Sequence, residues 1–416
     1  MHRRTLLAAA GASVVAMPAA PRAQSGIVLS LAWSHPHLYR DALEAILRLF
    51  HARHPGVEVR PRGASDNYDV LLQTVLRDAA VGAGPDLGFF GLQHVRILAE
   101  RGLSQPLDAL VGEPGFAASG RGPAAALGRF GGRQHALGYS LSVPTIFFNA
   151  ELLRRAGGDP DALPADWEAM IAVATRLNGL GGGIQSGFLE HPGNDWYFQN
   201  LVHGAGGRML TADERRVAFD GAEGLAAMRV FHRLAREGGM PALGRLQAVP
   251  PFLAGRMGFY ANSTSYIRNL TRDVAGRFPL RALVLPRLSA EGRLCPGGAG
   301  IVQLARDPAR AEAARRFVLF VTSAEAQAVM ARTTGYAPTN SLSEEALADH
   351  YAASPMHRTA SEHLHLLTDW YAYPGPNAPR MGRITSDRVD EVVSLRRGPE
   401  EALRDLARDV QALLPA

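Results

Sequence analysis

Short apolar segments alternate with segments of helical periodicity, and this order restricts most strongly what the chain can fold into. Residues 27–33 and 57–59 have the pattern of strands, and residues 41–52 between them place their apolar side chains at helical spacing. A second helix is expected over residues 69–80 and an apolar strand over residues 87–90. Strand-helix-strand order of this kind predicts an α/β fold with a mostly parallel, doubly wound sheet.

The length of the chain predicts two lobes. With 416 residues it exceeds the size, roughly 250–300 residues, at which a single core stops growing. A crossing near Ser142 leads into a region of new helices, and the strand-like residues 282–285 and 300–304 flank the turn where the chain returns to the first lobe. We expect a first lobe of residues 24–141 and 292–321 and a second lobe of residues 142–291 and 322–416. Such repeated crossings predict a hinge.

Further helices are expected throughout the second half of the chain. They cover residues 166–177, 222–237, 265–274, 309–321, 324–333 and 400–414, each with apolar residues at helical spacing.

The first 23 residues have the pattern of an export signal. Arg3 and Arg4 precede an Ala-rich apolar run that ends in small residues near Ala23. The paired arginines are typical of a twin-arginine signal, with a Sec signal as the alternative. We therefore expect an exported, periplasmic protein, and no later segment approaches the roughly 18 apolar residues of a membrane span.

Composition excludes several classes of function. Hydrophobic residues make up 47% and charged residues 20%, as in an ordinary globular protein. The net charge of +5 falls to about +2 without the signal, and the basic residues are dispersed, so no nucleic-acid partner is expected. All 44 basic residues are Arg, which excludes Schiff-base and P-loop lysines. Cys295 is the single cysteine and is expected in the core.

No motif predicts catalysis, a metal or a cofactor. The chain lacks Gly-x-Ser-x-Gly and His-Glu-x-x-His. The pairs His35/His37 and His363/His365 lack further ligands at metal-site spacing. We therefore expect neither an enzyme nor a metalloprotein.

Four segments and the export signal together resemble the extracellular solute-binding proteins of ABC importers. The segments are Gly84-Pro85-Asp86, residues 142–157, Gly297-Gly298, and Thr334-Gly335-Tyr336-Ala337-Pro338. They occur in the family's order and span nearly the whole mature chain. The resemblance implies a two-lobe periplasmic binding protein of type II that closes on a solute by hinge rotation. Within the family, the chain is most similar to proteins that bind glycerol-3-phosphate and related phosphodiesters.

The resemblance also implies positions for ligand contacts. These are Tyr68, Ser142, Ser263 or Thr264, the backbone of Gly298, Tyr336, and Arg388, whose spacing from Gly382 is similar to that of the family's phosphate-binding Arg. A phosphate needs an Arg fork together with hydroxyl and N–H donors. Alternatives remain open: Tyr68 as a turn residue, Ser263 as a helix cap, and Arg388 paired with a neighbouring Asp.

Aromatic residues add further candidates. Trp196 is expected in the site because the loop before it is built of Gly, Pro, Asn and Asp. Trp370, Tyr371 and Tyr373 are expected either to line the cleft or to pack the last helices.

The sequence departs from the phosphodiester-binding subfamily at two points. No acidic residue follows the strand after Asp86, where Gln93 stands, and Gly193 replaces one of two tryptophans three residues apart. We therefore expect a roomier pocket that accepts a substituted phosphodiester such as glycerophosphocholine.

The sequence thus predicts a monomeric binding protein that delivers a phosphorylated polyol, glycerol-3-phosphate or a glycerophosphodiester, to an ABC permease. The alternative within the family is a sugar or oligosaccharide ligand, with Trp196 and Tyr336 stacked on sugar rings. Alternatives from other classes are a secreted hydrolase or lyase without a known motif and a partner-binding scaffold.

Overall fold

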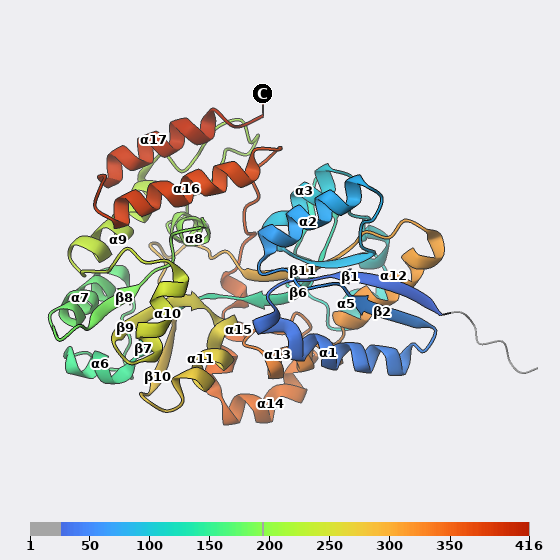
Figure 1. The fold of residues 1–416 in the computed structure, drawn as a ribbon, viewed down its shortest axis with the longest axis horizontal. Coiled ribbons are helices and arrows are strands. Elements are labelled where there is room, and N and C mark those ends of the chain that lie inside the picture. The colour runs from blue at the N-terminus through green and yellow to red at the C-terminus, as the bar shows by residue number, and fades with distance from the viewer. Residues whose placement is uncertain (1–25, 194, 416) are drawn as a thin grey trace, which may run out of the picture.

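The computed structural model describes residues 26–193 and 195–415, which form two lobes (Figure 1). The expected export signal, residues 1–23, lies outside the described residues. Within those residues, none of the helices combines the length and the apolar character needed to cross a membrane.

The first lobe is built on a five-stranded sheet with the order β2-β1-β3-β11-β6. β1 pairs in parallel with β2 and β3, whereas β11 runs antiparallel to β3 and β6. The expectation of a mostly parallel sheet is confirmed here, because β6, like β1, β2 and β3, runs opposite to β11, and β11 is the one reversed strand among the described residues of this sheet. It runs the other way because it returns from the second lobe. The strands are β1 (Ile27–Ala32), β2 (Val57–Pro61), β3 (Leu87–Gly91), β6 (Leu137–Ser142) and β11 (Gly297–Gln303).

Helices cover both faces of this sheet, so the fold is doubly wound. One face packs against α1 (Pro36–Arg53), α12 (Pro308–Val321) and α13 (Ala324–Thr333), and the other against α2 (Tyr68–Ala80) and α3 (Val95–Glu100). Buried Ala326 and Met330 of α13 belong to the first-lobe core, so the expected boundary between residues 321 and 322 separates helices that share one core. Smaller elements are η1 (Leu92–His94), α4 (Asp108–Val111), α5 (Pro114–Ala118), β4 (Arg129–Phe130) and β5 (Arg133–Gln134).

The second lobe has a four-stranded sheet with the order β10-β7-β9-β8. β7 runs antiparallel to β9 and β10, and β8 pairs in parallel with β9. The strands are β7 (Pro144–Asn149), β8 (Gln185–Phe188), β9 (Met257–Ser263) and β10 (Leu280–Val284).

Helices again pack on both faces of the second sheet. The larger core takes its residues from α7 (Trp167–Asn178), α8 (Trp196–Gly204), α9 (Ala222–Arg236), α16 (Ala378–Val393) and α17 (Pro399–Gln411), together with α6 (Ala150–Arg155). The smaller core takes them from α10 (Arg245–Leu253), η2 (Thr264–Tyr266) and α11 (Ile267–Val274). α16 and α17 lie beside α9 at the outer end of this lobe (Figure 1).

Side-chain caps fix where several helices begin. Asn67 accepts a hydrogen bond from the backbone N–H of Val70 at 2.9 Å and starts α2, which places Tyr68 in its first turn. Asp166 and Ser323 cap α7 and α13 in the same way.

Parallel connections between the lobes form the hinge. Ser142 pairs with Gly297 in the first sheet, whereas Pro144, two residues later, pairs with Ser263 in the second. Bridges of Leu141 with Ala337 and of Leu294 with Leu367 hold the other connections beside this one. The last connection contains α14 (Ser343–Ala353), η3 (Pro355–Arg358), α15 (Thr359–Glu362) and η4 (Leu364–Leu366). The predicted two-lobe α/β fold is confirmed.

Candidate functional site

A cavity of about 960 Å³ lies between the lobes and takes its walls from both of them. Six of the predicted site residues line it: Tyr68, Ser142, Trp196, Ser263, Gly298 and Tyr336. The position of the cavity at the hinge is the usual place for a ligand in two-lobe proteins.

Tyrosines of the first lobe form a hydrogen-bonded group on one wall. The hydroxyl of Tyr39 lies 2.7 Å from those of Tyr68 and Ser140, and its ring stacks on Tyr336 with centroids 5.2 Å apart. Burial raises the pKa of Tyr39, Tyr68 and Tyr336 well above the usual value, so their hydroxyls stay protonated. The group presents hydroxyl donors to a ligand.

The floor of the cavity is formed where the chain crosses between lobes. Gly298 has φ 116°, and a Cβ there would lie 1.9 Å from the carbonyl oxygen of Ser140, so β11 can approach β6 only with glycine at this position. The hydroxyl of Ser142 is buried and has no hydrogen-bond partner among the described residues. It is therefore available to a ligand.

The second lobe supplies an aromatic and hydroxyl wall. Trp196 is 6% exposed and donates from Nε1 to the carbonyl of Pro296 at 3.3 Å, which fixes its ring at the hinge. The hydroxyl of Ser263 lies 2.7 Å from that of Ser265, and both residues line the cavity.

Trp370, Tyr371 and Tyr373 line the cavity and also pack against the core that contains α16 and α17, so both alternatives from the sequence hold. The rings of Trp196 and Trp370 lie 5.9 Å apart, and those of Tyr371 and Tyr373 lie 5.6 Å apart. Together they form an aromatic wall on the second-lobe side.

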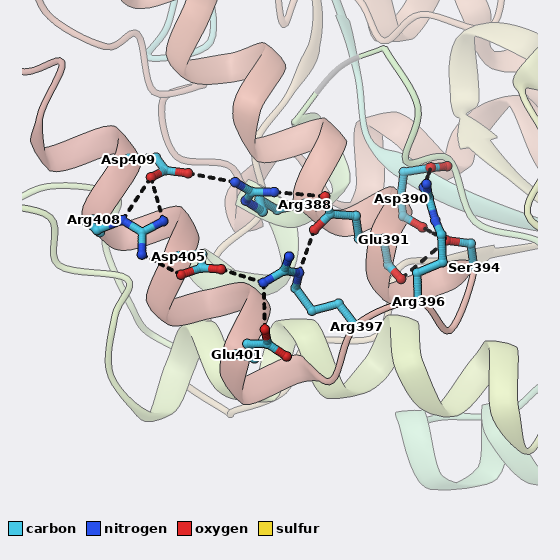
Figure 2. Close-up of polar contacts among 10 residues, drawn as sticks. All are labelled: Arg388, Asp390, Glu391, Ser394, Arg396, Arg397, Glu401, Asp405, Arg408 and Asp409. Carbon is cyan, nitrogen blue, oxygen red and sulfur yellow. Dashed lines mark hydrogen bonds and ion pairs between the residues drawn. The ribbon is translucent and has the colours of Figure 1, made fainter.

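Two predicted site residues lie elsewhere, and this corrects the expectation for both. Thr264 is fully buried, and its hydroxyl accepts the backbone N–H of Val143 at 3.3 Å, so it holds the hinge connection. Arg388 does not line the cavity. Its guanidinium donates to Glu391 and Asp409, each at 2.8 Å, and clips α16 to α17 (Figure 2).

Sequence reasoning missed the arginines that do line the cavity. Arg383 lies on α16 next to Gly382 and makes no hydrogen bond or ion pair within residues 26–193 and 195–415. Arg245 begins α10, and its Nε lies 3.9 Å from a carboxylate oxygen of Glu190. Arg383 directly follows Gly382, from which the resemblance placed the phosphate-binding Arg at Arg388. No feature of the neighbouring sequence distinguishes Arg383 from Arg388.

The carboxylate of Asp195 is the most unusual charged group in the cavity. It accepts a hydrogen bond from Nε2 of Gln199 at 2.9 Å and has no ion pair within the described part of the chain. Burial raises its pKa to about 6, because the surrounding protein disfavours the charged form. Asp69, Glu190 and Asp387 also line the cavity, so carboxylates outnumber the two arginines.

His35 at the cavity adds neither positive charge nor a metal site. Burial lowers the pKa of His35 to about 3, so it is neutral at physiological pH. Among the described residues there is no group of three or more His, Cys, Asp or Glu placed to hold a metal ion.

Comparison with known families identifies the class of protein. A family profile for the bacterial extracellular solute-binding proteins matches residues 45–359. The chain belongs to this family. Its role is that of the solute-binding component of an ABC importer, whose partners are a small solute and the importer's permease.

Solved structures share the fold of this solute-binding protein. UgpB from Mycobacterium tuberculosis, in complex with glycerophosphocholine, has a TM-score of 0.81 and 22% identity over 92% of this chain and 97% of that chain. The GacH receptor of Streptomyces glaucescens, solved unliganded and with acarbose, has a TM-score of 0.78 and 20% identity over 94% and 98%. Lmo0181 from Listeria monocytogenes, in complex with cycloalternan, has a TM-score of 0.79 and 17% identity over 93% and 99%. No curated protein matches significantly.

Proposed function

We propose that this solute-binding protein captures a glycerophosphodiester with a cationic head group, such as glycerophosphocholine, by hinge closure. One observation carries the proposal: the same cavity contains the guanidinium of Arg383 and the carboxylate of Asp195, and neither has an ion pair among the described residues. A zwitterion supplies the missing partner of each. Neutral sugars supply an ionic partner to neither group when closure removes water.

Several donors support the phosphate end of this ligand. The Ser142 hydroxyl and Nε1 of Trp370 are buried at the cavity and lack a partner within the described residues. Nε1 of an indole only donates, so it requires an acceptor. Together with Arg383, these groups suit the oxygens of a phosphodiester.

Aromatic rings support the cationic end. Asp195 lies in the same cavity as Trp196, Trp370 and Tyr373, whose ring faces attract cations. A quaternary ammonium is large and poorly hydrated, so it pairs well with a buried carboxylate among rings.

The size of the cavity favours a ligand larger than glycerol-3-phosphate. Its volume of about 960 Å³ is near the upper end of the usual range of small-molecule sites, roughly 300–1,000 Å³. Gly193 and Gln93, the two departures from the subfamily, both line it, and nothing lies within 4 Å of a Cβ built at Gly193. Phe89 and Phe90 are buried in the first lobe and do not fill this space.

A sugar or oligosaccharide is the second candidate. The surplus of carboxylates over arginines favours it, because carboxylates accept hydrogen bonds from sugar hydroxyls and the aromatic wall suits stacking. Solved structures of similar fold bind acarbose and cycloalternan as well as glycerophosphocholine.

Calorimetric titration of the mature protein with glycerophosphocholine, glycerol-3-phosphate and maltose tests the proposal. We expect the diester to bind most tightly, because it alone supplies both charges. Tight binding of glycerol-3-phosphate without the diester would contradict the cationic subsite. Binding of maltose alone would overturn the phosphodiester and favour the sugar.

A further inference from the structure

A bidentate ion pair joins the two lobes at one rim of the cavity. Arg96 lies on α3 of the first lobe, and Glu214 lies in the second lobe between α8 and α9. Nη1 and Nη2 of Arg96 lie 2.6 and 2.7 Å from the two carboxylate oxygens of Glu214. This fork geometry gives the strongest kind of side-chain ion pair.

The first lobe holds the Arg96 side chain in place. Nε donates to Glu100 at 2.7 Å, and the guanidinium lies over the ring of Phe130, 4.7 Å from its centroid. The side chain is 11% exposed, so little of the interaction is weakened by solvent. Nη1 also donates to the carbonyl of Ala372 in the second lobe's aromatic segment at 3.2 Å.

The second lobe presents Glu214 from a rigid turn. Glu214 has φ 57°, a left-handed conformation that costs free energy for a residue with a side chain. Its N–H donates to the carbonyl of Thr211 at 2.8 Å, and just after it Gln411 of α17 donates to the carbonyl of Arg215 and accepts from the N–H of Val217. The turn therefore holds Glu214 in an unfavourable conformation that aims it at the first lobe.

The ion pair is connected directly to the cavity wall. The hydroxyl of Tyr371 donates to Glu214 at 2.8 Å, and Tyr371 lines the cavity. Gln199 bonds both the N–H and the carbonyl of Tyr371, and it also donates to Asp195. A continuous set of hydrogen bonds thus runs from Arg96 to the inner surface of the site.

The opposite rim has weaker contacts between the lobes. Arg268 of α11 lies 3.0 Å from Asp41 of α1, with side chains 43% and 63% exposed, and also donates to the carbonyl of Thr333 at 2.7 Å. Asn269 donates to the carbonyl of His37 at 3.2 Å. These contacts are exposed and the ion pair is not bidentate, so each contributes little to stability. The contact between the two lobes is therefore stronger at the rim that contains Arg96.

We propose that Arg96 is a positioning residue that stabilises the closed arrangement of the lobes and sets the Tyr371 wall through Glu214. The role goes beyond the identity of the solute and holds for a phosphodiester or a sugar. Breaking the pair shifts the ligand-free protein toward an open state and, by linkage, lowers the affinity for any solute that binds the closed state.

Spin-label distance measurements on ligand-free protein test this role without a ligand. Labels at Val81→Cys in the first lobe and Arg236→Cys in the second report the separation of the lobes, and buried Cys295 stays unlabelled. We expect Arg96→Ala and Glu214→Gln to lower about tenfold the ratio of molecules with a short distance between the labels to molecules with a long one. Because the Arg96 side chain is largely shielded from solvent, salt at about 0.5 M should shift the unsubstituted protein far less than Arg96→Ala does.

The matched control is Arg229→Ala, which removes an ion pair with Glu400 at 2.8 Å inside the second lobe. It should leave the distances unchanged. Circular dichroism shows whether each variant is folded. If Arg96→Ala does not fold, Glu214→Gln still tests the proposal. Distances in the folded variants equal to those of the unsubstituted protein, or an equal shift in Arg229→Ala, would overturn the proposal.

Discussion

The two sides of helix α16 place arginines in opposite circumstances. Arg383 faces the cavity without an ion pair in the described part of the chain, whereas Arg388 is bound to Glu391 and Asp409 and holds α16 against α17 (Figure 2). A helix turns by about 100° per residue, so five residues place these side chains roughly 140° apart. The comparison teaches that the pairing of an arginine, rather than its distance from a glycine motif, decides whether its charge is available to a ligand.

The largest expected effect comes from the cavity side of the helix. Arg383→Ala should weaken glycerophosphocholine binding by about 2 kcal/mol, because the phosphate loses its charged partner in a closed, water-poor site. Arg383→Lys should recover part of this loss, since the charge remains but the planar fork does not. Calorimetric titration measures both variants.

Arg380→Ala is the matched control, because Arg380 is exposed, lies one turn earlier on α16 and does not line the cavity. It should bind the diester like the unsubstituted protein. Equal affinity of Arg383→Ala and Arg380→Ala would remove Arg383 from the site and weaken the comparison between the two sides of α16.

The second prediction concerns the carboxylate that lies beside α16. A Cβ built at Gly382 would lie 3.7 Å from an oxygen of Asp195. The pKa of Asp195 is raised to about 6, so burial of its charge lowers the stability of the ligand-free protein at neutral pH. Asp195→Asn should therefore raise the free energy of unfolding at pH 7.5 by about 1–2 kcal/mol.

The sign of this effect gives it a characteristic pH dependence. Below about pH 4 the carboxyl is protonated in both the folded and the unfolded chain, so the substitution changes little. The gain of Asp195→Asn should grow as pH rises toward 6 and then level off, and the affinity of the unsubstituted protein for the diester should fall as pH drops below 6. Urea unfolding across this range, with Asp387→Asn as a control, measures the first trend. A pH-independent gain would show that the amide acts through packing instead of charge.

Local patterns predicted most of the fold. The helices expected over residues 166–177 and 222–237 appear as α7 and α9, because apolar periodicity and caps act over a few residues. The reversed direction of β11 was not predictable in this way, since it depends on how the chain crosses between the lobes. For the same reason α13 lies in the core of the first lobe.

The candidate site was predictable where a backbone constraint marks it. Gly298 stands where β11 admits no side chain, and Ser142 stands at a crossing. The roles of the charged residues were not predictable from the sequence, because they depend on tertiary contacts. Such contacts alone distinguish Arg383, Arg388 and Asp195. Sequence patterns around a helix do not reveal which side faces a second helix and which a cavity.

The smallest expected effect lies on the far side of α16 and concerns stability. Arg388 has a side chain 22% exposed, and its ion pair with Asp409 connects α16 with α17, whereas its ion pair with Glu391 lies within α16. Arg388→Ala should lower the free energy of unfolding by about 1 kcal/mol, because Asp409 and Glu391 lose a partly buried partner. Binding of glycerophosphocholine should change far less than in Arg383→Ala.

Arg408, which is 67% exposed in the same network, is the control, and Arg408→Ala should be nearly neutral for stability. A loss of affinity in Arg388→Ala as large as in Arg383→Ala would mean that the ion pairs of Arg388 position the cavity side of α16. The two sides of the helix would then both determine binding.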